Sequence, residues 1–259
     1  MKFLIQTIGG SIRHDFVFIL KEAEHYYNWW NDDPLELKEA KIGDIANIEH
    51  PEIYIPVGTV EFVSEYLQTF FPWAKDTLRP LNVPECLFPF AGRVIENIYS
   101  REDFSERFKQ LDSIYVKSLD EIKDDFNGPK YARTGTISDW YESKDFVHCQ
   151  VSEMINIASE WRVIVFNGEI QHIGNYSGDC LVFPDGETIR NMVKAYGEAA
   201  PKAWTLDVAV TTDSKTVVLE CHRFFSCGLY GFSDLRRIPK MYSQTWYEMI
   251  MPKNIFKDS

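Results

Sequence analysis

Cysteine is scarce in this sequence and is never placed for a disulfide framework or a zinc knuckle. The 259 residues include five cysteines, an odd number, and no two of them are spaced as CxxC. They are Cys86, Cys149, Cys180, Cys221 and Cys227. Scattered cysteines of this kind are typical of a reducing compartment, so we expect a cytoplasmic protein without disulfides.

Long apolar runs are missing as well. No stretch of about 18 apolar residues is present, so no membrane-spanning helix is expected. The apolar start of the chain, Met1–Gln6, is too short for the core of a signal peptide and is soon followed by Gly9 and Gly10. The sequence therefore predicts neither a membrane protein nor an exported one.

An excess of positive charge is the third absence. The chain has 39 acidic and 27 basic residues, which gives a formal net charge of −12. A field of this sign attracts neither bare nucleic acid nor an anionic membrane, although a local basic site for a small phosphate ligand remains compatible with it. Hydrophobic residues make up 45% of the chain, enough to build a real core.

Two β-branched runs near the C-terminal end predict a hairpin. They are residues 206–211 and 216–222, and the residues between them are polar. If the loop is centred between Asp213 and Ser214, Asp207 lies directly opposite Glu220, and His222 points to the same face as Glu220. Two carboxylates this close repel each other unless a cation lies between them.

Carboxylate oxygens in such a pair suit magnesium that is bridged to phosphates. The alternative is a solvated hairpin whose acidic pair is accidental, because outward acidic residues are common on half-exposed sheets. The hairpin by itself leaves both interpretations open.

The clearest local signal is a second hairpin, in which Asn167-Gly168 joins residues 160–166 to 169–173. Asn-Gly between two such runs predicts a type I′ turn. Glu160 and Arg162 share one face of the first strand. This acid and this arginine could pair with each other or reach different parts of one ligand.

Two further strands carry polar residues that could meet a nucleotide. A predicted strand over 113–117 ends at Lys117, and a charged loop with Lys123 follows it. A lysine at a strand end can contact a phosphate, or it can simply be solvated. A predicted strand over 145–157 contains Glu153 and Ile155, and its backbone amides could pair with the edge of an adenine.

Periodicity predicts the remaining elements. Strands are expected at 2–8 and 52–57, helices at 15–31, 60–70, 101–111, 186–199 and 241–250, and a proline-rich connector between 72 and 89. The turn at Gly58-Thr59 could bind an anion at the helix N-terminus that follows it, or it could be an ordinary connection.

Taken in chain order, these pieces resemble the ATP-grasp superfamily of carboxylate–amine ligases. The similarity is greatest to the clade named for two arginines and a lysine, which is found largely in phages and bacteria. It is carried by residues 55–62, 115–117, 159–162 and 228–231. It implies an α+β fold in which a small N-terminal α/β domain (1–90) precedes a two-lobed ATP-grasp domain (91–259, with lobes 91–150 and 151–259).

The resemblance also implies which residues bind the nucleotide. Lys117 would contact the phosphates of ATP, with Lys123 as a helper. Glu153 and the backbone around Ile155 would meet the adenine. Glu160 would meet the ribose or nearby polar groups.

The same resemblance implies the catalytic and metal-binding residues. Arg162 would bind the transferring phosphoryl group and would act together with Lys117. Asp207 and Glu220 would hold Mg²⁺, and His222 stands where the family usually has asparagine as a further ligand. Imidazole is a poorer magnesium ligand than an amide oxygen.

A second departure from the family pattern is Thr205. Many ATP-grasp ligases have an arginine two residues before the metal-binding aspartate, where this chain has Thr205. Arg162 would replace that charge.

The implied activity is an ADP-forming ligation through an acyl-phosphate, with ATP and Mg²⁺ as cofactors. The substrates would be a small-molecule, amino-acid or peptide carboxylate and an amine acceptor, with no nucleic-acid or membrane partner. A phosphotransferase with the same nucleotide site and a degenerate, non-catalytic ATP-binding module are the alternatives. The sequence does not define the substrates or the oligomeric state.

Overall fold

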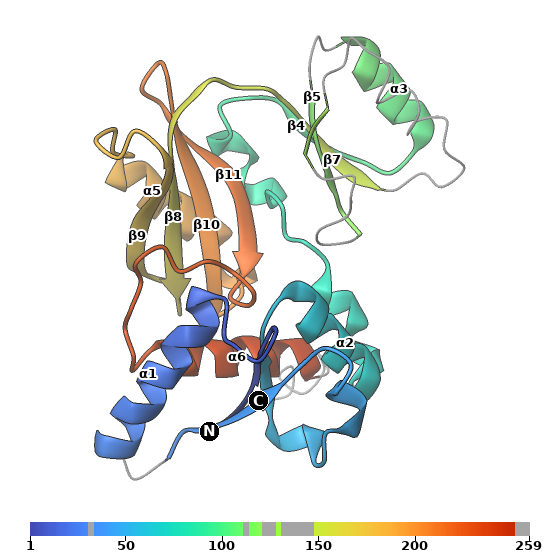
Figure 1. Cartoon of the computed structure of the whole chain (residues 1–259). Helices are drawn as coiled ribbons and strands as arrows, with labels where there is room; N and C mark the ends of the chain where they lie inside the picture. The colour runs from blue at the N-terminus through green and yellow to red at the C-terminus, as the bar shows by residue number, and fades with distance from the viewer. Residues whose placement is uncertain (31–33, 111–113, 121–127, 131–147, 252–259) are drawn as a thin grey trace.

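The chain has an α+β architecture, shown as a computed structural model in Figure 1. The structure describes residues 1–30, 34–110, 114–120, 128–130 and 148–251. Within these ranges the strands form one three-stranded and two four-stranded sheets. None of the helices in the described ranges combines the length and apolarity needed to cross a membrane.

The first sheet is parallel and has the order β2-β1-β3. Its elements are β1 (Lys2–Gln6), α1 (Asp15–Trp30), β2 (Glu36–Ala40), β3 (Ile55–Val57) and α2 (Val60–Phe70). The helices predicted over 15–31 and 60–70 and the strand predicted over 2–8 are confirmed. The strand predicted over 52–57 is wrong in its first half, because Pro51–Ile53 forms a 3₁₀ turn that begins at a proline.

The second sheet is antiparallel and has the order β4-β7-β5-β6. Its elements are β4 (Ile95–Ile98), α3 (Arg101–Gln110), β5 (Ile114–Ser118), β6 (Gly128–Lys130) and β7 (Cys149–Glu153). The strand predicted over 145–157 is too long. Strand β7 ends at Glu153, three residues outside the strands follow, and residues 145–147 lie outside the described ranges.

The third sheet is antiparallel and has the order β11-β10-β8-β9. Its elements are β8 (Ile157–Phe166), β9 (Glu169–Gly178), α5 (Gly186–Tyr196), β10 (Ala203–Thr211) and β11 (Thr216–Arg223). Asn167 and Gly168 have φ angles of 51° and 76°, as a type I′ turn requires. Both hairpins predicted from the sequence are therefore confirmed.

The two faces of this third sheet pack against different neighbours. Helix α5 covers one face with its buried stripe, which includes Ile189 and Met192. The other face joins the core of the N-terminal sheet, which also contains α6 (Ile238–Ile250). Figure 1 shows α6 lying beside the N-terminal elements. The last helix of the described residues thus packs with the first ones, and the predicted domain boundary near residue 90 stays a prediction.

The connector between the first and second sheets is built of short turns. Two 3₁₀ segments, Pro72–Leu78 and Glu85–Phe90, lie in the proline-rich stretch. Prolines lack the amide needed for a longer helix interior or a central strand, so short turns are the expected outcome there. Outside this connector, Ile45–Asn47 forms a 3₁₀ turn between β2 and β3, and Gly197–Ala199 forms one directly after α5.

Candidate nucleotide and metal site

Asp207 and Glu220 lie directly opposite each other on β10 and β11, as the sequence predicted. Thr205 and His222 form the next pair of the same face. The register shifts directly after Asp207, where Val208 pairs with Val218. The pairing predicted from the centre of the loop therefore holds only from Asp207 towards Trp204. Irregularities of this kind often lie next to functional sites because they re-aim side chains.

Asp207 is bound by an arginine from the strand on its other side. Strand β8 pairs with β10 so that Arg162 lies opposite Asp207. Arg162 donates from Nε to Oδ1 at 2.8 Å and from Nη2 to Oδ2 at 2.7 Å. Burial alone would lower the pKa of Arg162, but the two hydrogen bonds and the charge of Asp207 outweigh it and hold this pKa above its ordinary value. Bidentate pairs of this kind are strong and geometrically specific.

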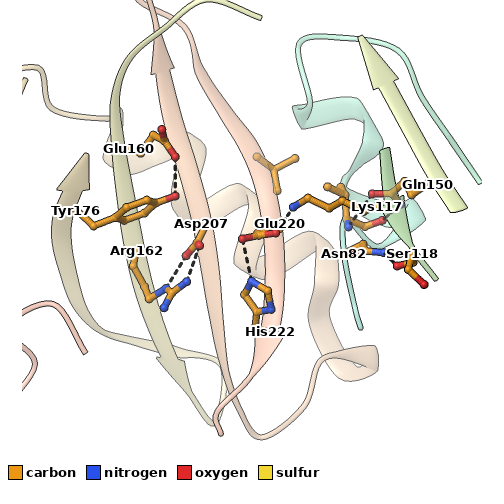
Figure 2. A network of polar contacts seen from close by, with 12 residues as sticks. Asn82, Lys117, Ser118, Gln150, Glu160, Arg162, Tyr176, Asp207, Glu220 and His222 are labelled. Carbon is orange, nitrogen blue, oxygen red and sulfur yellow. Dashed lines mark hydrogen bonds and ion pairs between the residues drawn. The ribbon is translucent and has the colours of Figure 1, made fainter. Parts of the chain in front are cut away.

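Glu220 contacts two basic side chains, a lysine and a histidine. Lys117 of β5 makes an ion pair with Glu220, and His222 Nε2 lies 2.9 Å from Glu220 Oε1. Burial alone would raise the pKa of Glu220, but Lys117 and His222 outweigh it and hold this pKa well below its usual range. Figure 2 shows Lys117 reaching from the second sheet to Glu220 on the third.

The side chains of Asp207, Glu220 and His222 converge on one point. One potential ligand atom from each of the three lies within 4.8 Å of the others. Two carboxylates fit magnesium, which is usually bound by one or two of them together with substrate phosphates. The imidazole of His222 fits this ion less well, and it contacts Glu220 directly.

A cavity of about 250 Å³ opens beside this cluster, between the second and third sheets. The predicted nucleotide-binding residues Lys117, Glu153, Ile155 and Glu160 all line it, together with Glu220. Lys123 lies outside the described residues. Five predicted residues from four strands or their flanking turns therefore share one cavity.

The comparison with protein-family models agrees with this geometry. The model described as "ATP-grasp domain, R2K clade family 2" matches residues 90–238, more than half of the chain. The chain belongs to this family. The predicted family and the α+β ATP-grasp fold are confirmed. No curated protein matches the chain.

Solved ATP-grasp structures share the fold at low sequence identity. D-cycloserine synthetase DcsG has a TM-score of 0.60 at 10% identity, over 95% of this chain and 100% of that one. The RimK domain ATP-grasp protein from Sphaerobacter thermophilus has a TM-score of 0.55 at 12% identity, over 97% and 100%. A RiPP-associated ATP-grasp ligase from Chryseobacterium gregarium, in complex with ADP and a leader and core peptide, gives 0.54 at 10% identity, over 97% of both chains.

The cavity of about 250 Å³ between the second and third sheets also contains an arginine that the sequence analysis missed. Arg93 lines it and donates from Nη1 to Ala91 O at 3.0 Å and to Val218 O at 2.8 Å. Burial lowers its pKa to about 10. Arg93 pairs with no carboxylate in the described ranges, so it is a further candidate for contact with nucleotide phosphates. Its only sequence signal, an arginine just before a short strand, is not specific.

Glu160 does not pair with Arg162, which was one of the two alternatives for this strand. The hydroxyl of Tyr176 donates to Glu160 Oε2 at 2.9 Å (Figure 2). Burial raises the pKa of Tyr176, and the charges of Asp207 and Glu160 raise it further. The two side chains of this pair, Glu160 and Tyr176, both line the cavity.

A second cavity, of about 300 Å³, adjoins the cluster of Asp207, Glu220 and His222. Arg162, His222 and Tyr230 line it, whereas Glu220 and Tyr176 line the first cavity. Tyr176 and Tyr230 stack with ring centroids 5.1 Å apart, and the guanidinium carbon of Arg162 lies 5.0 Å from the centre of the Tyr230 ring. The stacked rings therefore lie where the two cavities meet, with Glu220 beside the first cavity and Arg162, which binds Asp207, beside the second.

Proposed function

We propose that this ATP-grasp protein is an ADP-forming carboxylate–amine ligase. A substrate carboxylate attacks the γ-phosphorus of ATP and forms an acyl-phosphate, and ADP leaves. An amine then attacks the acyl carbon, phosphate leaves, and an amide bond remains. The observation that carries this proposal is the convergence of Lys117, Arg162, Asp207 and Glu220 between two adjoining cavities.

The first cavity would bind ATP. The backbone around Ile155 and Glu153 would meet the adenine, and Glu160 would meet the ribose. Lys117 lies at the end of the cavity next to Glu220, where the phosphates would lie, and Arg93 is a second cation available to them. Lys123 stays a predicted helper.

Asp207 and Glu220 would hold Mg²⁺ together with the phosphates of ATP, and His222 would hold Glu220 in place or supply a further ligand. Bound there, the ion would neutralise charge on the phosphates. Arg162 already binds Asp207 and lines the second cavity, so its guanidinium would stabilise the charge that develops on the transferring phosphoryl group.

The second cavity would bind the carboxylate substrate. The ATP-grasp ligase from Chryseobacterium gregarium was solved with a leader and core peptide, which supports a peptide carboxylate here, and a small-molecule or amino-acid carboxylate stays the predicted alternative. The five unpaired cysteines agree with a cytoplasmic location.

The test is an assay for ADP formation with hydroxylamine as the nucleophile, because hydroxylamine converts an acyl-phosphate into a hydroxamate whatever the natural amine is. The Asp207→Asn/Glu220→Gln variant should lose magnesium-dependent hydroxamate formation while its circular dichroism stays unchanged. Asp213→Ala, an acid in the turn of the same hairpin that is 59% exposed, is the matched control and should retain activity.

Other outcomes point elsewhere. A stable phosphorylated product without hydroxamate would indicate a phosphotransferase. ATP binding with no ADP formed from any acid would indicate a non-catalytic module, in keeping with His222 and Thr205 at positions where the family usually has asparagine and arginine.

A further inference from the structure

Tyr176 joins the two cavities of the candidate site. Its hydroxyl donates to Glu160 Oε2 at 2.9 Å, and both side chains line the first cavity. Its ring stacks on the ring of Tyr230, which lines the second cavity, with centroids 5.1 Å apart. One side chain therefore contacts a residue from each cavity.

An irregularity in the third sheet gives Tyr176 its place. The pairing of β8 with β9 shifts by one residue after Glu160, and Tyr176 is the extra residue on β9. A bulge of this kind bends its strand and re-aims a side chain, and bulges are over-represented next to active sites. Figure 2 shows the side chain of Tyr176 reaching from β9 towards Glu160.

Aromatic rings and a carbonyl hold the part of Arg162 that Asp207 does not. The guanidinium carbon lies 5.0 Å from the centre of the Tyr230 ring and 5.9 Å from that of the Tyr176 ring. Nη1 donates to Gly228 O at 3.2 Å. A cation near aromatic faces is stabilised more strongly where water is excluded, and Arg162 is buried. The two rings therefore restrict the direction in which this guanidinium points.

Glu160 keeps one carboxylate oxygen for a ligand. Oε2 accepts from Tyr176, whereas Oε1 accepts no hydrogen bond from the part of the chain that the structure describes. Burial raises the pKa of Tyr176, so its hydroxyl remains a donor at neutral pH. With Oε2 fixed in this way, Oε1 is oriented to accept a hydrogen bond from a hydroxyl group in the first cavity.

We propose that Tyr176 is a positioning residue for both ends of the nucleotide. Its hydroxyl orients Glu160 for the ribose of ATP, and its ring, together with that of Tyr230, orients Arg162 towards the γ-phosphoryl group. This inference rests on the proposed function, which assigns the ribose to Glu160 and the transferring group to Arg162. The two roles are separable, because one belongs to the hydroxyl and the other to the ring.

Two nucleotides distinguish the two ends. Isothermal titration is carried out on the full chain with magnesium and either ADP or a non-hydrolysable ATP analogue. Both probes have the ribose, and only the analogue has a γ-phosphoryl group. The affinity for ADP therefore reports on the Glu160 end, and the ratio of the two dissociation constants reports on the Arg162 end.

Tyr176→Phe keeps the ring and removes the hydroxyl. It should weaken binding of both nucleotides by a similar factor, roughly 3- to 10-fold, and leave their ratio unchanged. Tyr176→Leu removes both parts, so it should also lower the preference for the analogue over ADP roughly 2- to 10-fold. Tyr230→Leu should change only the ratio. A ratio that is normal in Tyr176→Phe and lowered in Tyr176→Leu assigns the effect to the ring.

Tyr247→Phe is the matched control. Tyr247 is 47% exposed on α6 and lines neither cavity, so this variant should bind both nucleotides like the parent protein. Circular dichroism checks the fold of each variant. If Tyr176→Leu does not fold, Tyr230→Leu tests the role of the rings, because Tyr230 is 42% exposed.

Two results would overturn the proposal: Tyr176→Phe binds both nucleotides like the parent protein, or the ratio is unchanged in both leucine variants. Hydroxamate formation separates this failure from that of the ligase function, because the titrations need no turnover. Hydroxamate from the parent protein, with tyrosine variants that bind nucleotides like it, would refute the positioning role alone. The expected binding pattern without ADP formation from any acid would refute the ligase function alone.

Discussion

At the scale of single residues, the site depends on charges held out of water. Asp207 is 1% exposed and Arg162 is 8% exposed, so each neutralises the other in a poorly solvated place. A buried pair is costly to break, because removal of one partner leaves an uncompensated charge. The pair fixes the position of the carboxylate before any ligand binds.

Asp207→Ala should therefore destabilise the protein strongly, by about 3–5 kcal/mol. Chemical denaturation of Asp207→Ala, Arg162→Met and the double variant would measure the coupling between the two side chains. We expect the double variant to be less destabilised than the sum of the singles, since it leaves no unpaired charge. Additive effects would show that the two groups do not stabilise each other.

A buried thiol gives the second prediction at this scale. Cys227 is 6% exposed, and burial raises the pKa of its thiol to about 12, although Arg162 opposes the shift. A thiol whose pKa is higher in the folded state contributes stability that is complete below its unfolded pKa, near 9, and is lost as the pH rises towards 12. The loss is about 1.4 kcal/mol per pH unit.

Unfolding free energies at pH 8, 9 and 10 would show this loss. Cys227→Ala should have a shallower alkaline decline than the parent protein. The control is Cys180→Ala, because Cys180 is exposed. Identical slopes for the parent protein and Cys227→Ala would contradict the prediction.

At the scale of elements, the loop between β11 and α6 forms one wall of the second cavity. Its hydrogen bonds reach three parts of the fold. Ser226 donates to Gly58 O at 2.7 Å, and the Leu229 amide donates to the Asp15 carboxylate at 2.9 Å. His172 contacts Tyr230 O at 3.0 Å. Tyr230 has a φ of 45°, which a residue with a side chain adopts only when its surroundings hold it there.

Gly174 of β9 allows this loop to approach. A Cβ at position 174 would lie 2.4 Å from Tyr230 O, so Gly174→Ala should push the loop outwards. We expect a loss of stability of about 1–3 kcal/mol and a raised KM for the carboxylate substrate, with the KM for ATP changed less. Steady-state kinetics and thermal unfolding measure both.

Gly186→Ala is the matched control for Gly174→Ala. A Cβ at position 186 would meet nothing closer than Arg190 Nη1 at 3.6 Å, and Gly186 begins α5, away from the loop. It should leave activity and stability close to those of the parent protein. An unaffected Gly174→Ala variant would mean that the loop moves aside without consequence.

At the scale of the molecule, polar contacts join the second sheet to the third sheet and to the connector beside it. Lys117 pairs with Glu220 of the third sheet, and the connector residue Asn82, which bridges to Cys221, donates to Ser118 O at 2.7 Å (Figure 2). A nucleotide in the cavity between the sheets would add contacts to both. Binding should therefore stabilise the whole fold.

Saturating ATP analogue with magnesium should raise the unfolding free energy by about 2.7 kcal/mol at a ligand concentration 100 times Kd. Lys117→Met should lose most of this gain, because it removes the charge that, in the proposed function, would face the phosphates. Lys215→Met, an exposed lysine paired with Asp213, should keep it. Thermal denaturation with and without ligand measures the difference, and an equal gain in both variants would contradict the role of Lys117.

The sequence by itself determined the local parts of this protein. Strand alternation and the polar turn placed Asp207 opposite Glu220, and Asn167-Gly168 fixed the other hairpin, because register within a hairpin depends on residues that are close in the chain. The order of motifs along the chain also identified the ATP-grasp family.

Only the tertiary structure decided which strands became neighbours. Arg162 binds Asp207 because β8 lies beside β10, and no local pattern encodes that adjacency. Arg93 meets Val218 O across 125 positions of sequence, and Lys117 meets Glu220 across 103. Charges from distant segments acquire partners only when the sheets pack, because short-range electrostatic and hydrogen-bonding contacts require close approach.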